Sequence, residues 1–223
     1  MRNFLPLALG IAGTLVLLSL GVWQVQRLIW KAGVVDQIDL RIADAPVALP
    51  ALVSEAADEY RAVVVTGRYA AQSVDVLISF KRQGPGFRVI TPFTTDTGRS
   101  ILVDRGFVPE KQKSAPRGTG EVVITGNLLW PDEVDGFTPA PDMERNIWFA
   151  RDLPAMAGAL GTEPVLIVVR EISAPDAPMT AIPVDSARIS NDHLNYAITW
   201  FSLAAIWVAM TGYFLWRQRR PTA

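Results

Sequence analysis

The chain has 223 residues, of which 50% are hydrophobic, and its 21 Lys and Arg residues nearly balance its 22 Asp and Glu residues. This balance shows no excess of positive charge, so we expect no nucleic-acid partner. The absence of cysteine excludes disulfides, iron–sulfur clusters and thiolate zinc sites. A zinc enzyme would have to assemble its ligands from Asp and Glu around the single histidine, which is an unusual ligand set.

The first predicted element is a membrane span near the N-terminus. Residues 4–22 contain no charged side chain, and at about 1.5 Å per residue they cross most of a hydrocarbon core of about 30 Å. Trp23, Arg27 and Lys31 follow, as is typical of a membrane–water boundary. A secretory signal peptide is the alternative, but the apolar run exceeds a typical h-region and no small-x-small cleavage site follows closely. We therefore favour an uncleaved transmembrane helix within residues 1–25.

A helical stalk is predicted over residues 26–45, directly after this span. Apolar residues recur there at helical spacing, and Pro46 and Pro50 end the pattern. Within the span itself, Gly10, Thr14 and Gly21 fall on one helical face. Small residues on one face allow a second helix to approach closely.

The middle of the chain, residues 46–188, is predicted to be a β-rich domain. Segments rich in β-branched and aromatic residues, separated by Gly and Pro, predict strands at 60–69, 74–80, 87–93, 100–108, 121–129 and 165–172. The turn KRQGPG predicts a hairpin between the second and third of these, and one short helix is expected at 153–160, ending at Gly161. The predicted fold is a membrane protein in which two transmembrane α-helices flank a mainly antiparallel β (α+β) extramembrane domain.

A second membrane span is predicted over residues 189–216, where the run 194–216 carries no charge. The Arg-rich tail, residues 217–223, is expected to stay in the cytoplasm. Two spans then place both termini in the cytoplasm and the large domain in the periplasm of a bacterial inner membrane. Arg27 and Lys31 favour the opposite orientation, so this topology depends on the C-terminal tail.

The charged residues of the β-rich domain are predicted to be structural. The sequence contains none of the motifs G-x-S-x-G, G-x-x-x-x-G-K-[ST] and G-x-G-x-x-G. Asp104 and Arg105 are adjacent in a strand, so they should point to opposite faces, each with a cross-strand partner. The acid pairs Asp58–Glu59 and Asp132–Glu133 are predicted to be solvated loop residues rather than acid–base catalysts.

His193 is the main candidate for a ligand-binding residue. Ser190 or Asn191 can cap the second span, which places His193 in the first helical turn. The positive end of the helix dipole favours neutral imidazole there, and neutral imidazole is the form that binds metal. Tyr196 and Trp200 follow on the same face at helical spacing, together with Ala197, Ala204 and Trp207. A porphyrin could stack on this face with its iron on the imidazole.

The residues alone leave this interpretation open. A capping or interfacial histidine above an aromatic belt is the more frequent case, because the sequence offers no second ligand and no C-x-x-C-H motif. Trp23 and Arg27 are expected to share a face near His193 if both spans end at the same outer surface. Arg27 could pair with a haem propionate, although such a residue more often reaches the lipid headgroups.

The chain resembles a known family through six segments that occur in order. They are LGVWQVQRLIWK at 20–31, VTGRY at 65–69, GPGFRVITPF at 84–93, VDRGFVP at 103–109, GNLLWP at 126–131 and NDHLNYAITWFSLA at 191–204. Together they resemble the surfeit locus protein 1 family, membrane proteins that assist assembly of cytochrome c oxidase. The resemblance covers nearly the whole chain and implies two transmembrane helices with the large domain outside. It implies an assembly factor, not an enzyme.

The resemblance also implies a cofactor and partners. Family members act during maturation of oxidase subunit I, when haem a is inserted, and some bacterial members are similar to haem a carriers. The proposed iron ligand of those members is a histidine of the second helix, a position that His193 matches. The resemblance therefore favours His193 as a transient haem a ligand, with Trp200 as a pocket wall and with Tyr196, Arg27 and Trp23 as further candidate contacts. The implied partners are subunit I, haem a synthase, other oxidase assembly factors and the lipid bilayer.

Three functions are compatible with these sequence features. The first is an assembly factor that binds haem a transiently and delivers it to subunit I. The second is a scaffold that holds a subunit I intermediate and never binds haem. The third, and least favoured, is a membrane-anchored periplasmic enzyme.

Overall fold

The computed structural model describes residues 4–80, 83–187 and 189–219. The chain divides into two compact units, one of Met1–Gln37 with Ser186–Ala223 and one of Ile38–Asp185. We call them the helical unit and the β unit, and each is described by itself.

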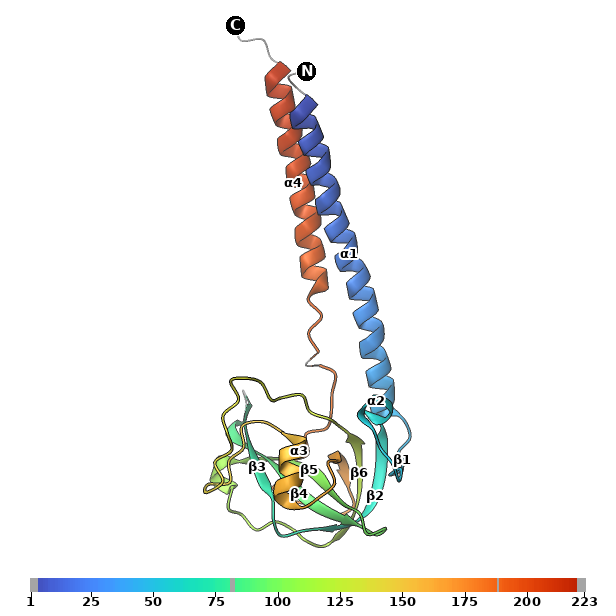
Figure 1. The fold of residues 1–223 in the computed structure, drawn as a ribbon, viewed down its shortest axis with the longest axis vertical. Helices are drawn as coiled ribbons and strands as arrows, with labels where there is room; N and C mark the ends of the chain where they lie inside the picture. Colours follow the sequence, from blue (N-terminus) through green and yellow to red (C-terminus); the bar gives the residue numbers. More distant parts are fainter. Residues whose placement is uncertain (1–3, 81–82, 188, 220–223) are drawn as a thin grey trace. The chain divides into compact units, whose positions relative to one another are not determined.

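Two long antiparallel helices make up the helical unit (Figure 1). Helix α1 (Phe4–Ala43) runs without a break from the predicted first span into the predicted stalk and ends two residues before the predicted end of the stalk. Only its first part belongs to this unit. Helix α4 (His193–Arg219) covers the predicted second span from residue 193 onward, because residues 189–192 lie before its first turn. Both helices are long and apolar enough to cross a membrane. Most of their apolar side chains are exposed, as expected if lipid surrounds them.

Small residues let α1 and α4 approach closely, as the sequence predicted. A Cβ atom added at Gly10 would lie 2.3 Å from Thr211 Cγ2, and one added at Gly21 would lie 2.7 Å from the Phe201 ring. On the side of α4, Ala197 and Ala204 are buried. The backbones are therefore close enough for side-chain hydrogen bonds between the helices. One of them joins Trp207 Nε1 to the Gly10 carbonyl at 3.0 Å.

The β unit is built on a sheet that closes into a barrel. Its described strands are β1 (Val47–Ala48), β2 (Ala62–Tyr69), β3 (Val74–Phe80), β4 (Gly84–Thr95), β5 (Ser100–Pro109), β6 (Glu121–Leu128) and β7 (Leu166–Ile172). Their order is β1-β2-β6-β7-β5-β4-β3, and β2 also pairs with β4. Strands β2, β6, β7, β5 and β4 thus form a closed ring, with β1 and β3 outside it. Short helices complete the unit: α2 (Glu55–Asp58), the 3₁₀ turn η1 (Glu110–Gln112) and α3 (Leu153–Leu160).

The predicted elements of this unit are confirmed. All six predicted strands are present, β3 and β4 form the predicted hairpin, and α3 ends at Gly161, which has φ of 65°. The sheet is mainly antiparallel, but β1 pairs with β2 and β5 pairs with β7 in parallel. Elements β1, α2 and η1 were not predicted, because each is too short for its residues to show a period.

Apolar side chains fill the barrel and a second layer under α3. The barrel interior holds Val63, Phe93, Ile101, Ile124, Leu128 and Ile167, all fully buried. Met156 of α3 packs with Trp148 and Leu166 on the outer face of the sheet. This core gives the β unit its own stability.

The end of α1 is fastened to the sheet of the β unit. The Ile42 carbonyl lies in the last turn of α1, where carbonyls have no hydrogen-bond donor within the helix. It accepts hydrogen bonds instead from Asn127 Nδ2 at 3.1 Å and from Arg170 Nη1 at 2.9 Å. Asn127 is fully buried and also donates to the Tyr60 carbonyl at 3.0 Å. The last turn of α1 is therefore part of the folded β unit and not a loose linker.

The close approach of α1 and α4 can be tested with Gly21→Leu. Because Phe201 occupies the space that any side chain at position 21 needs, the variant should lose about 1–3 kcal/mol of packing free energy. We expect a lower midpoint of thermal unfolding, followed by circular dichroism in detergent. The matched control is Gly33→Leu on the same helix, where a Cβ would have no neighbour within 4 Å. Equal midpoints for the two variants would contradict the close packing at Gly21.

Candidate functional site

The candidate site lies where α4 begins. His193 is the first residue of the helix, and the main-chain carbonyl of Asp192 accepts hydrogen bonds from the amides of Asn195 and Tyr196. Ser190 does not cap the helix, because its hydroxyl donates to the Asp192 carboxylate instead. His193 therefore occupies the first turn, as predicted.

A buried glutamine of α1 holds the imidazole. Gln24 is only 8% exposed, and its Oε1 lies 2.7 Å from His193 Nδ1. His193 itself is partly exposed, and no described residue is hydrogen-bonded to its Nε2. One ring nitrogen is thus engaged inside the helical unit, and the other is available to a ligand.

Gln24 was not among the predicted site residues, although it belongs to the first of the six family-like segments. The spacing of Gln24 from Gly21 could have identified it. Gln24 follows Gly21 by three residues, which places it on the same helical face as the glycines that contact α4. A polar side chain on the packed face of an apolar helix needs a hydrogen-bond partner, and this is a reason to look for one on the neighbouring helix.

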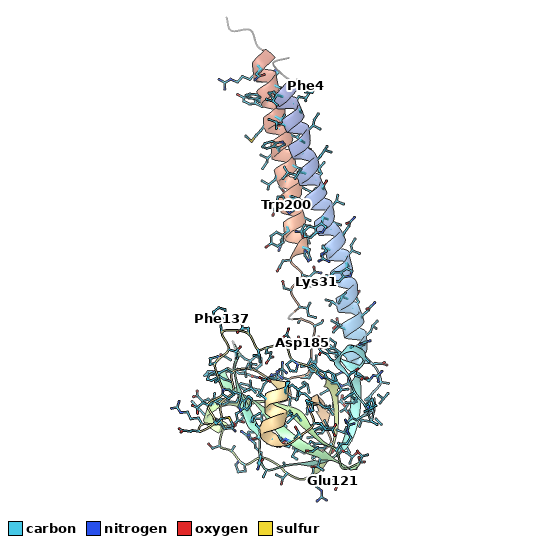
Figure 2. The ribbon with its side chains drawn as sticks, in the orientation of Figure 1. Phe4, Lys31, Glu121, Phe137, Asp185 and Trp200 are labelled. Carbon is cyan, nitrogen blue, oxygen red and sulfur yellow. The ribbon has the colours of Figure 1, made fainter. Side chains whose placement is uncertain are left out.

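The other four predicted site residues lie at exposed or partly exposed positions of α1 and α4. Trp200 is partly exposed on α4, seven residues beyond His193 (Figure 2), and Tyr196 is mostly exposed. Trp23 and Arg27 are both exposed on α1, close to Gln24 in sequence. The Arg27 guanidinium lies 4.9 Å from the centre of the Trp30 ring. Within the described part of the chain, His193 has its hydrogen bond with Gln24 and not with any of these four residues.

The face of α4 expected to stack a porphyrin is partly covered by α1. Ala197 and Ala204 are buried in the helix pair, and Trp207 donates to the Gly10 carbonyl. A flat ligand therefore cannot lie along the whole face. The part that remains exposed is next to Tyr196 and Trp200, near the start of the helix.

A metal site built from several side chains is not found in the part of the chain that the structure describes. These residues contain no group of three or more His, Asp or Glu side chains that could hold a metal ion. A single imidazole fits a metal that brings its own equatorial ligands, as haem iron does.

The charged residues of the β unit form compensated networks. Asp104, which is 1% exposed, accepts hydrogen bonds from Arg88, from Arg151 at 3.3 Å and from the Gly106 amide at 3.0 Å. Arg151 in turn donates to Glu133 from Nη2 at 2.5 Å. Burial raises the pKa of Glu133, but the hydrogen bonds and the charge of Arg151 outweigh it and hold the pKa below its usual value. Asp104, Arg88 and Arg151 are buried, and Glu133 closes the network at the exposed surface.

Arg105 and Asp104 have different partners, as their adjacent positions in the strand predicted. Arg105 is 2% exposed, donates from Nε to Asp176 at 2.8 Å and stacks on the Tyr69 ring at 4.0 Å. Asp104 has the predicted cross-strand partner in Arg88 of β4. The expectation of a cross-strand partner for Arg105 was wrong, because Asp176 follows β7 in an irregular segment.

The prediction that Asp58 is solvated was also wrong. Its side chain is buried, accepts a hydrogen bond from the Ser54 amide at 2.9 Å and pairs with Arg61 at 2.8 Å. The physical reason is local: the short helix α2 starts after Ser54, and the carboxylate satisfies an amide at that end. Asp132 and Glu133 are both exposed loop residues, as predicted, and Glu133 also pairs with Arg151.

Similarity to known proteins covers most of the chain. Residues 11–205 match the SURF1 family. The chain belongs to this family. Surfeit locus protein 1 of Homo sapiens is 36% identical over 84% of this chain and 70% of its own length. The proteins of the same name from Xenopus tropicalis and Mus musculus are each 34% identical, over 84% and 90% of this chain and 68% and 71% of their own lengths.

The SURF1 match includes the candidate site and the charged networks. Gln24, His193 and Asp104 all lie within the matched residues 11–205. The family resemblance inferred from the six sequence segments is therefore confirmed. The matched residues include the whole β unit and part of the helical unit.

The structural role of Asp104 can be tested with Asp104→Asn. The substitution keeps the shape of the side chain but removes the charge that compensates two buried guanidinium groups. Breaking such a network typically costs about 3–5 kcal/mol. We expect the free energy of unfolding of the full chain, measured with denaturant in detergent, to fall by an amount of this order.

Asp96→Asn is the matched control for this variant. Asp96 is exposed, and we expect its free energy of unfolding to stay within about 0.5 kcal/mol of wild type. If the two variants are equally stable, the network does not stabilise the β unit.

Proposed function

We propose that this protein assists assembly of cytochrome c oxidase by binding haem a through His193 and delivering it to subunit I. Membership of the SURF1 family supports the role in oxidase assembly. One observation carries the haem step: a lone imidazole at the start of α4 is held on Nδ1 by Gln24 and has no described partner on Nε2. This arrangement suits an axial ligand, because such a histidine is commonly oriented by a hydrogen bond on its other nitrogen.

The residues around His193 fit the chemistry of a haem. Haem a supplies an iron with open axial positions, a flat apolar ring and anionic propionates. His193 would hold the iron through Nε2, and Trp200 and Tyr196 would offer apolar surface to the ring. Arg27, whose guanidinium is exposed, pairs with a propionate, and Trp23 contributes apolar surface beside it.

A carrier must also release its cargo. One imidazole holds a haem less firmly than two, since the second axial position is left to water or to a group of the acceptor. His193 is the only histidine of the chain, and the sequence contains no cysteine. Bis-histidine and thiolate ligation are therefore excluded within one chain.

The proposed setting is a bacterial inner membrane. In this proposal α1 and α4 both cross the bilayer, the termini are cytoplasmic and the β unit is periplasmic. The Arg-rich segment after residue 216 supports this orientation. Subunit I is the proposed acceptor of the haem, and haem a synthase is the proposed donor. Other oxidase assembly factors are further proposed partners, and the protein itself acts without catalytic turnover.

One observation also favours the scaffold function, in which haem is never bound. The bond between Gln24 and His193 joins α1 to α4, so the histidine could serve only to hold the helix pair together. In that case removal of the imidazole would weaken the pair without changing any haem content.

The haem step can be tested by purifying the protein from cells that make haem a and recording its visible spectrum. We expect wild type to carry haem a and His193→Ala to lose most of it, because the axial ligand is gone. Asn195→Ala, a change at an exposed position in the same helical turn, is the control and should match wild type. Haem-free wild-type protein, from cells that make haem a in excess, would refute the carrier function and favour the scaffold.

A further inference from the structure

We propose that Gln24 is a positioning residue that fixes the tautomer of His193. Its amide oxygen accepts a hydrogen bond from Nδ1–H of His193. Nε2 then keeps the free lone pair, which an external ligand can bind. The identity of that ligand as haem a rests on the proposed function, but the tautomer itself does not.

The contact between the two side chains determines where the proton lies. Gln24 Oε1 and His193 Nδ1 are 2.7 Å apart, which is a short and strong hydrogen-bond distance. An amide oxygen can only accept, so Nδ1 must donate. A neutral imidazole carries one proton on its two nitrogens, and the proton on Nδ1 leaves Nε2 as the nitrogen with the free lone pair. Free histidine in water prefers the opposite tautomer, with the proton on Nε2, so the contact reverses the intrinsic preference.

The packing of the two helices holds Gln24 in place and brings His193 within reach of it. Gln24 is buried, and Gly21, less than one turn before it, brings α1 against the Phe201 ring. On α4, the buried Ala197 lies one turn after His193. Because Gln24 is buried between closely packed helices, its amide cannot turn away without disturbing the pair, and the imidazole is held by its hydrogen bond to that amide.

The reverse orientation of the amide would have the opposite effect. If the Gln24 amide group were rotated, its NH₂ would donate to Nδ1 and the imidazole proton would move to Nε2. Nε2 would then be unable to bind a metal. The orientation of one amide therefore decides whether the site can accept an axial ligand, and a measurement on the ligand-free protein can determine it.

The test is ¹⁵N NMR of the full chain in detergent micelles, with histidine labelled in both ring nitrogens. The single histidine gives one pair of ring-nitrogen signals, which their couplings to the carbon-bound ring protons assign to Nδ1 and Nε2. At a pH at which the imidazole is neutral, we expect Nδ1 to have the protonated-type shift and Nε2 the lone-pair-type shift. The opposite pattern in wild type would overturn the proposal.

Three variants separate positioning from a purely structural role. Gln24→Leu removes the acceptor, and the majority tautomer should change to Nε2–H. Gln24→Glu keeps an acceptor and should retain Nδ1–H. Gln26→Leu is the matched control, the same change at an exposed position of the same helix, and should resemble wild type. An unchanged tautomer in Gln24→Leu would overturn the proposal, and if that variant does not fold, wild type and Gln24→Glu still decide.

A second readout uses added ferric haem b as the probe. If Gln24 positions the ligand, Gln24→Leu should bind it about ten- to a hundred-fold more weakly than wild type, and Gln24→Glu should recover most of the affinity. Equal affinities in wild type and Gln24→Leu would overturn the positioning role. If no variant binds haem while the tautomers follow the expectation, the positioning proposal stands and the haem function fails.

Discussion

The close approach of α1 and α4 is the constraint on which the candidate site depends. Glycines on α1 and alanines on α4 remove the side chains that would otherwise hold the two backbones apart. Only at this separation can an amide of one helix reach an imidazole of the other. The site is thus a consequence of helix packing, and it would not exist in either helix alone. In the proposed function this packing prepares an imidazole whose Nε2 is free for haem a.

The β unit is held together in part by buried charges that are paired with one another. Its buried charges are compensated within the unit: Asp104 by two arginines, and Arg105 by Asp176 and the face of Tyr69. Such networks hold a fold in one arrangement, since any shift would leave a charge unpaired in a region of low dielectric constant. Ile42, at the end of α1, is bound to Asn127 and Arg170 of the sheet. The buried charges of the unit are therefore engaged in holding its own fold.

The helices and strands could be predicted well from the sequence, and the contacts between distant elements poorly. The strands are runs of β-branched residues between Gly and Pro, and Gly161 marks the end of α3, so local pattern was sufficient for both. The parallel pairing of β5 with β7 depends on a crossover that no local pattern reveals. Asp58 was misjudged because its partners, the Ser54 amide and Arg61, meet it in a turn too short to show a pattern. His193 was found from its rarity and position. Gln24 was not identified as a site residue, since its partner His193 lies 169 residues away in the sequence.

The proposed ligation of haem a by His193 can be tested most directly by chemical rescue. His193→Gly removes the imidazole and leaves a space that free imidazole can enter. The protein would be purified from cells that make haem a, and its haem a content measured with and without added imidazole. We predict that His193→Gly carries little haem a alone and regains much of it with imidazole. A variant that retains the wild-type haem a content without imidazole would contradict axial ligation by His193.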